Sequence, residues 1–411
     1  MAGSLIELEE ARRIVLECVR TLDSEDVGLK DALGRVLAEE ILAADAVPSF
    51  DNSAMDGFAI RAEDIREADR DAPASLELVG ESRAGLPAQS VVGSGQAIAI
   101  STGAMMPEGA DAVIPVEDTA QANGTVSVFA QSPPGRWVRR AGEDIVAGAS
   151  VFTPGTRLGP AELGVLASLG HASAICTRCP RVSVLTTGDE LVGPEAALSP
   201  GAVRDASAHS IPALARLAGA EVVPVARAPD QEQAIERAIA DALSSDVVIV
   251  CGGVSVGKHD HVKDAFAALE VRERFSAIAL RPGKPTWFGV RGQTLVFGLP
   301  GNPVSSMVTF ILLVGPALRA LSGAPMQTLA TTATLVSDYE KAPGRAHAVR
   351  CRLRLSESGW EAEPTGPQGS HVLTSMVDAQ ALAIIPSASG SLRAGERVQI
   401  ELLAPWTGEQ P

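Results

Sequence analysis

The stretch that decides the fold is Val247-Val248-Ile249-Val250-Cys251-Gly252-Gly253, a short apolar run that ends in two glycines. Val182-Ser183-Val184-Leu185-Thr186-Thr187-Gly188-Asp189-Glu190 has the same form, an apolar run that ends in a polar loop with glycine. Helical patterns lie between them, near 208–218 and over 231–244. Alternating strands and helices are typical of a parallel sheet with helices on both faces. We therefore expect a central three-layer α/β domain over residues 179–326.

Outside this domain the pattern changes to short strands interrupted by glycine and proline. Residues 48–138 are interpreted as a β-rich lid insert, and 327–411 as a small C-terminal β domain. The segments 1–47 and 139–178 are grouped as an N-terminal and linker domain, which begins with a helical pattern over 5–20. A chain of 411 residues is too long for one compact core. The expected fold is therefore a multidomain protein of α/β and β type.

The composition excludes some classes of function. The formal net charge is −16, from 34 basic and 50 acidic residues, so binding to nucleic acid is not expected. No run approaches the roughly 18–20 apolar residues of a membrane helix, and the N-terminus lacks the features of a signal peptide. The five cysteines are an odd, sparse set, which indicates reduced thiols and a cytoplasmic protein. Cys176 and Cys179 form an isolated CxxC, read as two loop cysteines rather than a metal or redox pair.

Three loops should meet at one edge of the predicted sheet, because ligands of open parallel sheets bind beyond the carboxyl ends of the strands. They are 187–190, 252–260 and 298–305, and the last of them directly precedes a helix. Glycine allows the backbone to approach a ligand closely, and amides at the start of a helix favour an anion. Each loop alone also fits an ordinary turn, but together they predict a phosphate-binding site.

Carboxylates accompany these glycines. Asp189, Glu190 and Asp260 follow strands, and Asp230 precedes a helix. Mg²⁺ prefers oxygen ligands, and a phosphoanhydride beside several carboxylates needs such a cation to offset repulsion. Asp230 alternatively fits a helix N-cap.

Other polar segments are open to a second interpretation. Arg281-Pro282-Gly283-Lys284-Pro285 holds two cations in a loop stiffened by proline, or is a solvated basic turn. Asp51-Asn52-Ser53-Ala54-Met55-Asp56-Gly57 is a functional loop, or a turn that caps a helix. Ser101-Thr102-Gly103-Ala104 and Gly142-Glu143-Asp144 also fit polar surface turns.

Taken together, these segments resemble the molybdopterin molybdenumtransferases, molybdenum insertases related to the C-terminal domain of gephyrin. The matching segments, in chain order, are 48–57, 101–104, 108–113, 139–145, 187–191, 252–257, 282–285, 299–305 and 368–371. The resemblance implies an elongated homodimer whose α/β domain binds adenylylated molybdopterin. The lid insert and the C-terminal domain would close the site, partly across the dimer. The implied reaction takes molybdate, uses Mg²⁺ and releases AMP with the finished cofactor, and the molybdopterin adenylyltransferase is a possible partner.

The resemblance and the loop pattern together give a set of candidate residues. The catalytic candidates are Asp56, Thr102, Asp144, Glu190 and Asp260. The substrate-binding candidates are Thr187, Gly188, Asp230, Gly252, Gly253, Ser255, Arg281, Lys284, Pro300, Gly301, Asn302, Pro303, Arg350 and Ser370. The metal candidates are Glu190, Asp230 and Asp260.

Two other functions fit parts of the same pattern. A molybdopterin adenylyltransferase needs only an α/β domain of this kind, and neither the 51–57 loop nor the β domains. A non-catalytic scaffold, as the relationship to gephyrin implies, would not need complete acidic loops. The chain departs from the usual family pattern at Phe58, Ser207 and Lys258, and over residues 344–348.

Overall fold

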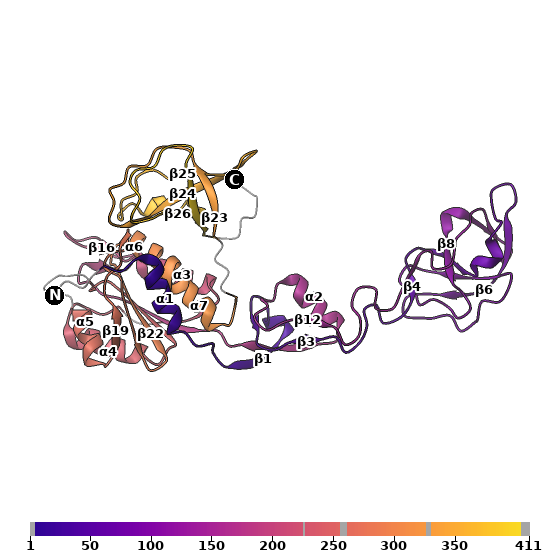
Figure 1. The fold of residues 1–411 in the computed structure, drawn as a ribbon. Coiled ribbons are helices and arrows are strands. Elements are labelled where there is room, and N and C mark those ends of the chain that lie inside the picture. The colour runs from indigo at the N-terminus through magenta and orange to yellow at the C-terminus, as the bar shows by residue number, and fades with distance from the viewer. Residues whose placement is uncertain (1–4, 225–226, 255–260, 326–329, 404–411) are drawn as a thin grey trace.

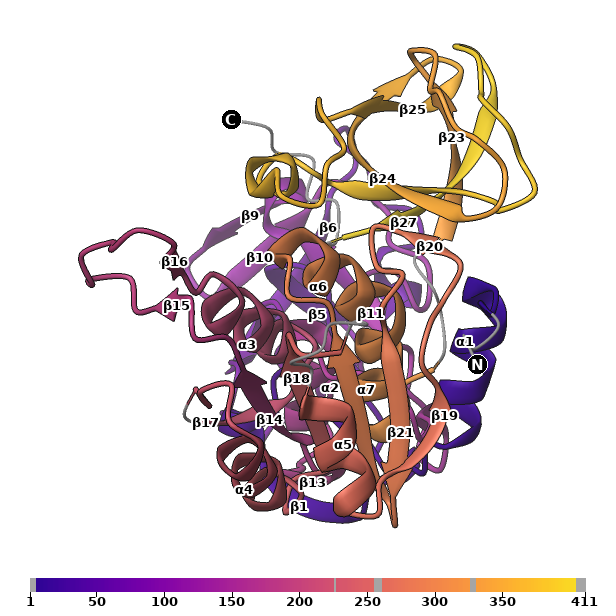
Figure 2. The same ribbon diagram turned by 90° about the vertical axis from the view of Figure 1, so that its left-hand side faces the viewer.

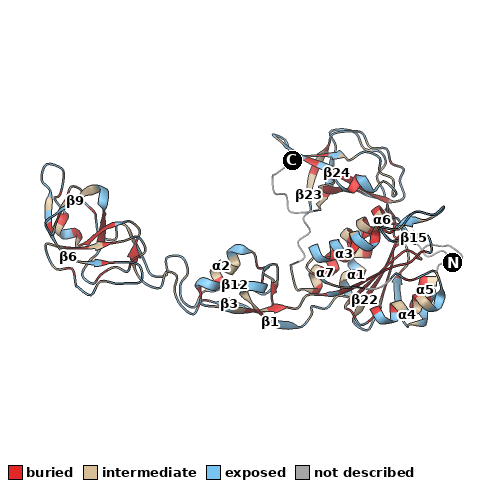
Figure 3. Ribbon diagram, turned by 180° about the vertical axis from the view of Figure 1, so that it is seen from behind, coloured by how far each residue is buried: buried red, intermediate tan, exposed pale blue. Residues whose placement is uncertain are grey.

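The computed structural model describes residues 5–224, 227–254, 261–325 and 330–403. These residues form an elongated molecule (Figure 1). A sheet covered by helices lies at one end with a β domain beside it, a small domain follows, and a second β domain stands at the far end. The same order is seen from behind in Figure 3, where the strands of the helix-covered sheet are buried.

The α/β domain is built on one sheet with the strand order β17-β14-β18-β22-β21-β19. Its strands are β14 (Arg181–Thr186), β17 (Glu221–Pro224), β18 (Val247–Cys251), β19 (Arg272–Phe275), β21 (Trp287–Arg291) and β22 (Thr294–Leu299). Its helices are α3 (Ser207–Leu217), α4 (Glu232–Ala242), α5 (His261–Ala268), α6 (Pro303–Thr309) and α7 (Gly315–Leu321), with a π-helical turn η4 (Phe310–Val314) between the last two.

The sheet is parallel only in part. β17, β14, β18 and β22 are parallel to one another, whereas β21 runs antiparallel to both of its neighbours, β22 and β19. The reason is the connection between β21 and β22. Only Gly292 and Gln293 separate the paired residues Arg291 and Thr294, and a parallel pair needs a crossover of a dozen or more residues.

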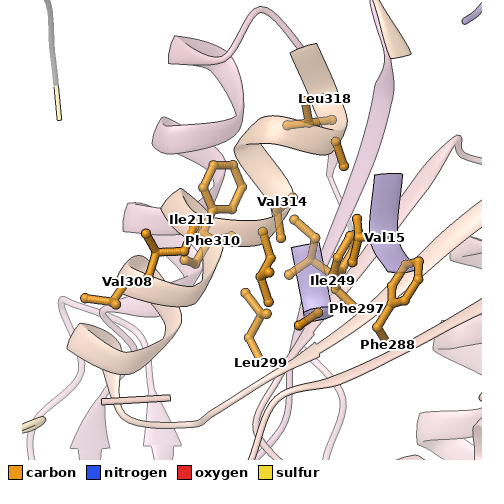
Figure 4. Packing of buried hydrophobic residues seen from close by; sticks show 14 of the residues in the cluster. Val15, Ile211, Ile249, Phe288, Phe297, Leu299, Val308, Phe310, Val314 and Leu318 are labelled. Carbon is orange, nitrogen blue, oxygen red and sulfur yellow. The ribbon is translucent and has the colours of Figure 1, made fainter. Parts of the chain in front are cut away.

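Residues of the central strand β18 alternate between two hydrophobic clusters. Val247, Ile249 and Cys251 pack in a cluster with α3, α6 and α7, whereas Val248 and Val250 pack in another with α4 and α5. Figure 4 shows the first cluster, with Ile249 and the β22 side chains beneath the helix that runs through η4. Helices therefore cover both faces of this sheet, and every residue of β18 is buried.

The N-terminal helix α1 (Leu8–Glu17) packs on the α/β domain, although the sequence grouping placed it with residues 139–178. Leu8, Ala11 and Val15 belong to the same cluster as Ile249. The helical spacing predicted the buried face of this helix. The spacing does not indicate which domain that face packs against, because an amphipathic helix can bury its apolar face on any apolar surface.

The remaining N-terminal segments form a small domain between the α/β domain and the lid. Its elements are β1 (Ser24–Gly28), η1 (Leu29–Asp31), β2 (Val36–Leu37), β3 (Ile41–Leu42), β12 (Ser150–Phe152), α2 (Pro160–Ser168) and β13 (Ser173–Thr177). Cys176 lies inside β13 and is buried, so it is not a loop residue as expected. The described cysteines, which include Cys179, are all free.

The lid contains a mixed sheet with the order β8-β5-β7-β6-β10-β9. Its elements are β4 (Asn52–Ser53), β5 (Gly57–Ile60), η2 (Ala62–Ile65), β6 (Ala74–Ser82), β7 (Gln96–Ile100), β8 (Ala112–Pro115), η3 (Val116–Asp118), β9 (Thr119–Ala122), β10 (Thr125–Val128) and β11 (Val138–Arg139). Its core, which includes Phe58, Ile60 and Ile114, is separate from that of the α/β domain.

The C-terminal domain closes on itself like a barrel, because β24 pairs with β26 as well as with β25. Its elements are β23 (Ala330–Leu335), β24 (Ala346–Ser356), β25 (Gly359–Pro364), η5 (Leu373–Met376), β26 (Ala381–Ile385) and β27 (Arg397–Leu402). The short strand β20 (Leu280–Arg281) of the α/β domain pairs with β24, and the two lie together in Figure 2. The short strands β15 (Leu191–Val192) and β16 (Val203–Arg204) form the arm that projects at the left of the same view.

Among the described residues, one helix is long and apolar enough to cross a membrane, by length and composition only. It spans Pro303–Leu321, 19 residues, and 78% of its most apolar window is buried inside the protein. Figure 4 shows this helix packed on the central sheet. It is therefore the core helix of the α/β domain.

Candidate functional site

A cavity of about 540 Å³ opens beyond the carboxyl ends of β14, β18 and β22. Ten of the candidate residues line it: Thr187, Gly188, Glu190, Asp230, Gly252, Gly253, Pro300, Gly301, Asn302 and Pro303. They come from four connections that are far apart in the sequence, those that follow β14, β17, β18 and β22. Parallel strands bring these connections to one edge of the sheet, which is the position expected for a ligand of an α/β domain.

The pocket loops after β14 and β18 approach each other too closely for a side chain at Gly252. Gly252 has φ of +101°, and a Cβ atom there would lie 2.7 Å from the carbonyl oxygen of Thr187. Gly301 of the third loop lies beside Gly252, where a Cβ atom would be in ordinary van der Waals contact, 3.6 Å from the Gly252 Cα. Among the described residues, the amides of Gly253 and Gly301 donate no hydrogen bond. These amides are therefore available to an anionic ligand.

Asp230 joins two of the loops and does not cap its helix. Its carboxylate accepts hydrogen bonds from the Thr187 hydroxyl and from the amide of Asp189, the latter at 3.3 Å. The Asp230 amide in turn donates to the Asp189 carboxylate at 3.0 Å. Helix α4 has Gln231 at its N-cap, without a side-chain cap. The alternative interpretation of Asp230 as an N-cap is therefore wrong, and its carboxylate holds the pocket loops together.

Glu190 is exposed and lines the cavity, so its carboxylate is accessible to a ligand. The other two loop candidates, Ser255 and Asp260, lie outside the described residues. Among the described residues, no group of three or more His, Cys, Asp and Glu side chains is placed to hold a metal ion. Glu190 and Asp230 are the two metal candidates that the structure brings to the cavity.

Sequence reasoning missed Asp205, Ser207 and Pro285, which also line the cavity. The carboxylate of Asp205 is 8% exposed and accepts hydrogen bonds from the Thr186 hydroxyl at 2.6 Å and the Ala208 amide at 2.9 Å. An Asp three residues before an amide at the start of a helix is a capping signal, which could have identified it. Its bond to Thr186 ties the start of α3 to the end of β14.

The C-terminal domain holds a buried cation, the candidate Arg350, which does not line the cavity. Arg350 is 1% exposed, and its guanidinium donates to the Ser375 hydroxyl at 3.1 Å and to the carbonyls of Ala348 and Gly369. All of these acceptors are neutral, and burial lowers the pKa of Arg350 from its usual range. The adjacent Ser370 accepts a hydrogen bond from the Asn302 side chain at 3.2 Å, which connects this domain to the cavity wall.

Arg281 and Lys284 are near this junction but do not line the cavity. Arg281 pairs through β20 with His347 of the C-terminal domain, and Lys284 is exposed. His347 is buried, and burial followed by repulsion from Arg281, Lys341 and Arg345 lowers its pKa to about 4. Three cations, Arg281, Lys341 and Arg345, therefore act on one buried imidazole at this junction.

The lid candidates are far from this cavity in a single chain (Figures 1 and 3). Asp56 is exposed, and its carboxylate accepts a hydrogen bond from the Thr102 amide at 2.7 Å. Asp144 is exposed where the chain returns from the lid, and its amide donates to the carbonyl of Val47. The structure thus brings Asp56 and Thr102 together but leaves both, and Asp144, away from the pocket loops.

Comparison with known proteins matches the same units. Residues 6–170 match the MoeA N-terminal region (domain I and II), 183–320 a domain described as "Probable molybdopterin binding domain", and 332–403 the MoeA C-terminal region (domain IV). The chain is 38% identical to the molybdopterin molybdenumtransferase of Haemophilus influenzae, over 97% of this chain and 98% of the relative. It is 34% identical to that of Bacillus subtilis, over 98% and 96%.

A solved structure is similar over the whole length. The molybdopterin biosynthesis moeA protein from Pyrococcus horikoshii OT3 superposes with a TM-score of 0.84 at 31% identity, covering 97% of this chain and 100% of that one. Fold and pocket thus define a multidomain protein of molybdenum cofactor biosynthesis, built around a molybdopterin-binding type of α/β domain. The chain belongs to the molybdopterin molybdenumtransferase family.

Proposed function

We propose that this protein inserts molybdenum from molybdate into molybdopterin, using the adenylylated form of the pterin and releasing AMP. The observation that carries the proposal is the convergence of the glycine loops with Glu190 and Asp230 in one cavity of about 540 Å³. A cavity of this size is in the range for a nucleotide-sized ligand. The N-terminal and C-terminal matches favour insertion over the adenylyltransferase alternative, which needs the α/β domain alone.

The phosphates of the substrate would lie on the glycine loops. The free amides of Gly253 and Gly301 donate to phosphate oxygens, and the start of the core helix at Pro303 favours negative charge there. Asp230 fixes the position of the Thr187 loop beside these glycine loops through its hydrogen bonds with Thr187 and Asp189. The substrate is therefore positioned by backbone that is already held in place.

The donor set at the cavity fits Mg²⁺. This ion is usually held by one or two carboxylates together with substrate phosphates and water, and Glu190 and Asp230 supply two carboxylates. We assign Glu190 and Asp230 as its ligands, with Asp260 as a further one. When bound, Mg²⁺ would stabilise the charge that develops as the phosphoanhydride breaks.

Molybdate would bind at the junction with the C-terminal domain. Arg350 and Lys284 offset its charge, and Ser370 offers a hydroxyl next to Asn302. The three acceptors of the Arg350 guanidinium are neutral, so no described carboxylate bonded to it cancels its positive charge, which would favour an anion nearby.

The lid would complete the site from a second copy of the chain. Asp56 and Asp144 are too distant from the cavity of their own chain to act there (Figure 1). We therefore propose a homodimer in which the lid acids of one protomer assist proton delivery as molybdate loses oxygen. Light scattering at micromolar concentration should give twice the chain mass of 42.4 kDa; a pure monomer with full activity contradicts this arrangement.

The decisive experiment supplies purified protein with adenylylated molybdopterin, Mg²⁺ and molybdate, and measures AMP and finished cofactor together. We expect AMP release that depends on molybdate. Formation of adenylylated molybdopterin from molybdopterin and ATP, with no response to molybdate, would instead support an adenylyltransferase. Binding without either reaction would support a scaffold. The adenylyltransferase that makes the substrate is a natural partner, and five cysteines in the sequence, all described as free, agree with a cytoplasmic setting.

A further inference from the structure

A second, much smaller cavity lies where the N-terminal domain meets the α/β domain. It measures about 20 Å³. The N-terminal domain contributes Gly34, Arg157 and Thr177 to its lining, and the α/β domain contributes Gly219, Arg319 and Ser322. No Asp or Glu of the described chain lines this cavity.

Two of the lining guanidinium groups lack an acceptor. Within the described ranges, neither Arg157 nor Arg319 makes a hydrogen bond or an ion pair through its side chain. The acid that attracts Arg319 is Glu401, and its carboxylate is already bound by Arg12. A third arginine at the cavity, Arg35, is engaged by Glu25 and by the carbonyl of Thr177.

The positive charge of Arg319 is in an unfavourable environment. Burial lowers its pKa, and repulsion from Arg157 and Arg12 lowers it further, with only Glu401 acting in the opposite direction. A half-buried guanidinium without hydrogen bonds has lost water without replacing it, which costs free energy. A negative partner between Arg157 and Arg319 would remove both problems.

An uncharged donor faces the same cavity. Thr177 is 4% exposed and lines the cavity, yet its hydroxyl forms no hydrogen bond to any residue that the structure describes. The terminal nitrogen of Arg157 reaches across the boundary: it lies 3.6 Å from the Cβ position of Gly34 and 4.0 Å from that of Gly219. Free donors therefore come from both domains, and acidic acceptors are absent from this part of the described lining.

We propose that this cavity binds one small inorganic anion, held by Arg157, Arg319 and the hydroxyl of Thr177. The volume excludes a nucleotide or a pterin. Chloride, sulfate, phosphate and molybdate share the required chemistry. Because Arg157 and Arg319 belong to different domains, the anion clamps the N-terminal domain to the α/β domain. The N-terminal domain also carries the lid through its connections at residues 43–51 and 140–149, so the clamp sets the position from which the lid reaches a partner protomer.

The test is thermal unfolding of the full chain in a zwitterionic buffer, with bulky gluconate keeping the ionic strength constant. Chloride, sulfate, phosphate and molybdate are titrated separately. At ten times its dissociation constant, a bound anion should raise the unfolding midpoint by about 2 °C or more. Arg157→Gln and Arg319→Gln should abolish this rise. Arg274→Gln, an exposed arginine on β19, is the matched control and should retain it.

Lys284→Gln tests whether the rise comes from anions bound at the junction with the C-terminal domain, and it should leave the rise intact. A bromide-soaked crystal should also give an anomalous peak between Arg157 and Arg319. In gluconate alone, Arg319→Gln should unfold no lower than the wild type, because it removes an unfavourable charge. The proposal is overturned if none of these anions raises the wild-type midpoint, or if all variants respond equally. Neither result depends on the insertase reaction, so the clamp and the proposed function can fail separately.

Discussion

The pocket of the α/β domain and the lid both carry candidate catalytic acids, but they are built in opposite ways. In the pocket, a Cβ atom at Gly252 would meet the Thr187 backbone at 2.7 Å. In the lid, Gly103 also has positive φ, +78°, yet a Cβ atom there meets nothing within 4 Å. The pocket loops are in close contact with one another within one chain. The lid presents its acids on an open surface, which indicates a site that needs another surface to become complete.

The largest effect is expected from the pocket acid that faces the ligand. Glu190→Gln keeps the shape of the side chain and removes the charge that a hard cation requires. Loss of several kcal/mol of charge stabilisation corresponds to a fall in AMP release of about 10³-fold. Single-turnover assays with saturating Mg²⁺ measure it, and circular dichroism should be unchanged. Glu195→Gln, an exposed acid beyond the short strand β15, is the control; full turnover in Glu190→Gln would exclude this metal ligand.

A smaller effect is expected from the lid. Asp56→Asn retains an oxygen that can accept the Thr102 amide, so the loop should keep its structure. Only the proton-transfer capacity is lost, so we expect the rate to fall by about 10²-fold. Binding of adenylylated molybdopterin, measured by calorimetry, should be nearly unchanged because the pocket loops are on another domain.

Asp71→Asn makes the same charge change on the exposed lid surface and should be neutral. Weaker substrate binding with normal chemistry would make Asp56 a structural turn residue.

Mixing Asp56→Asn protein with Glu190→Gln protein tests whether lid and pocket act across the dimer. If lid and pocket come from different protomers, the mixture should regain part of the activity that each variant lacks.

The two glycines provide a direct test of how differently the regions are packed. Gly252→Ala combines an unfavourable φ with a backbone clash, and should lower the free energy of unfolding by about 2–4 kcal/mol. Gly103→Ala carries only the cost of the left-handed conformation, about 1–2 kcal/mol. Denaturant titration of both variants measures the difference. Equal losses would show that the pocket loops can relax, contrary to their close packing.

The smallest effect concerns pH. His347 has its pKa lowered to about 4 in the folded protein, below the usual value of 6.5, so the unfolded chain binds a proton first as the pH falls. Stability should therefore decrease between about pH 6.5 and pH 4, by about 1–3 kcal/mol, and be fully present above that range. His347→Gln should weaken this dependence in thermal scans from pH 4 to 7. His171→Gln, a histidine of the N-terminal domain, should leave it unchanged.

The sequence predicted the pocket better than the rest of the site. Strands 182–185 and 247–250 were recognisable because a buried parallel strand is a continuous apolar run, and their loops follow at fixed positions. The capping bond of Asp205 to the Ala208 amide is local and could have been predicted, whereas its bond to Thr186 depends on tertiary folding. The reversed strand β21 was also missed, because residue type and spacing alone do not specify the direction in which a strand joins a sheet.

The sequence by itself determined which loops carry glycine and acid, and its resemblance to the molybdopterin molybdenumtransferases is borne out by relatives over nearly the whole chain. These properties are local, because they depend on residue type and spacing. Only the tertiary structure decided that Asp230 joins the Thr187 loop, that Arg350 is buried among neutral acceptors, and that α1 belongs to the α/β core. It also decided that the lid is remote from its own pocket and that Arg157 meets Arg319. These relations join residues that are distant in the chain, and no local pattern encodes which surfaces meet.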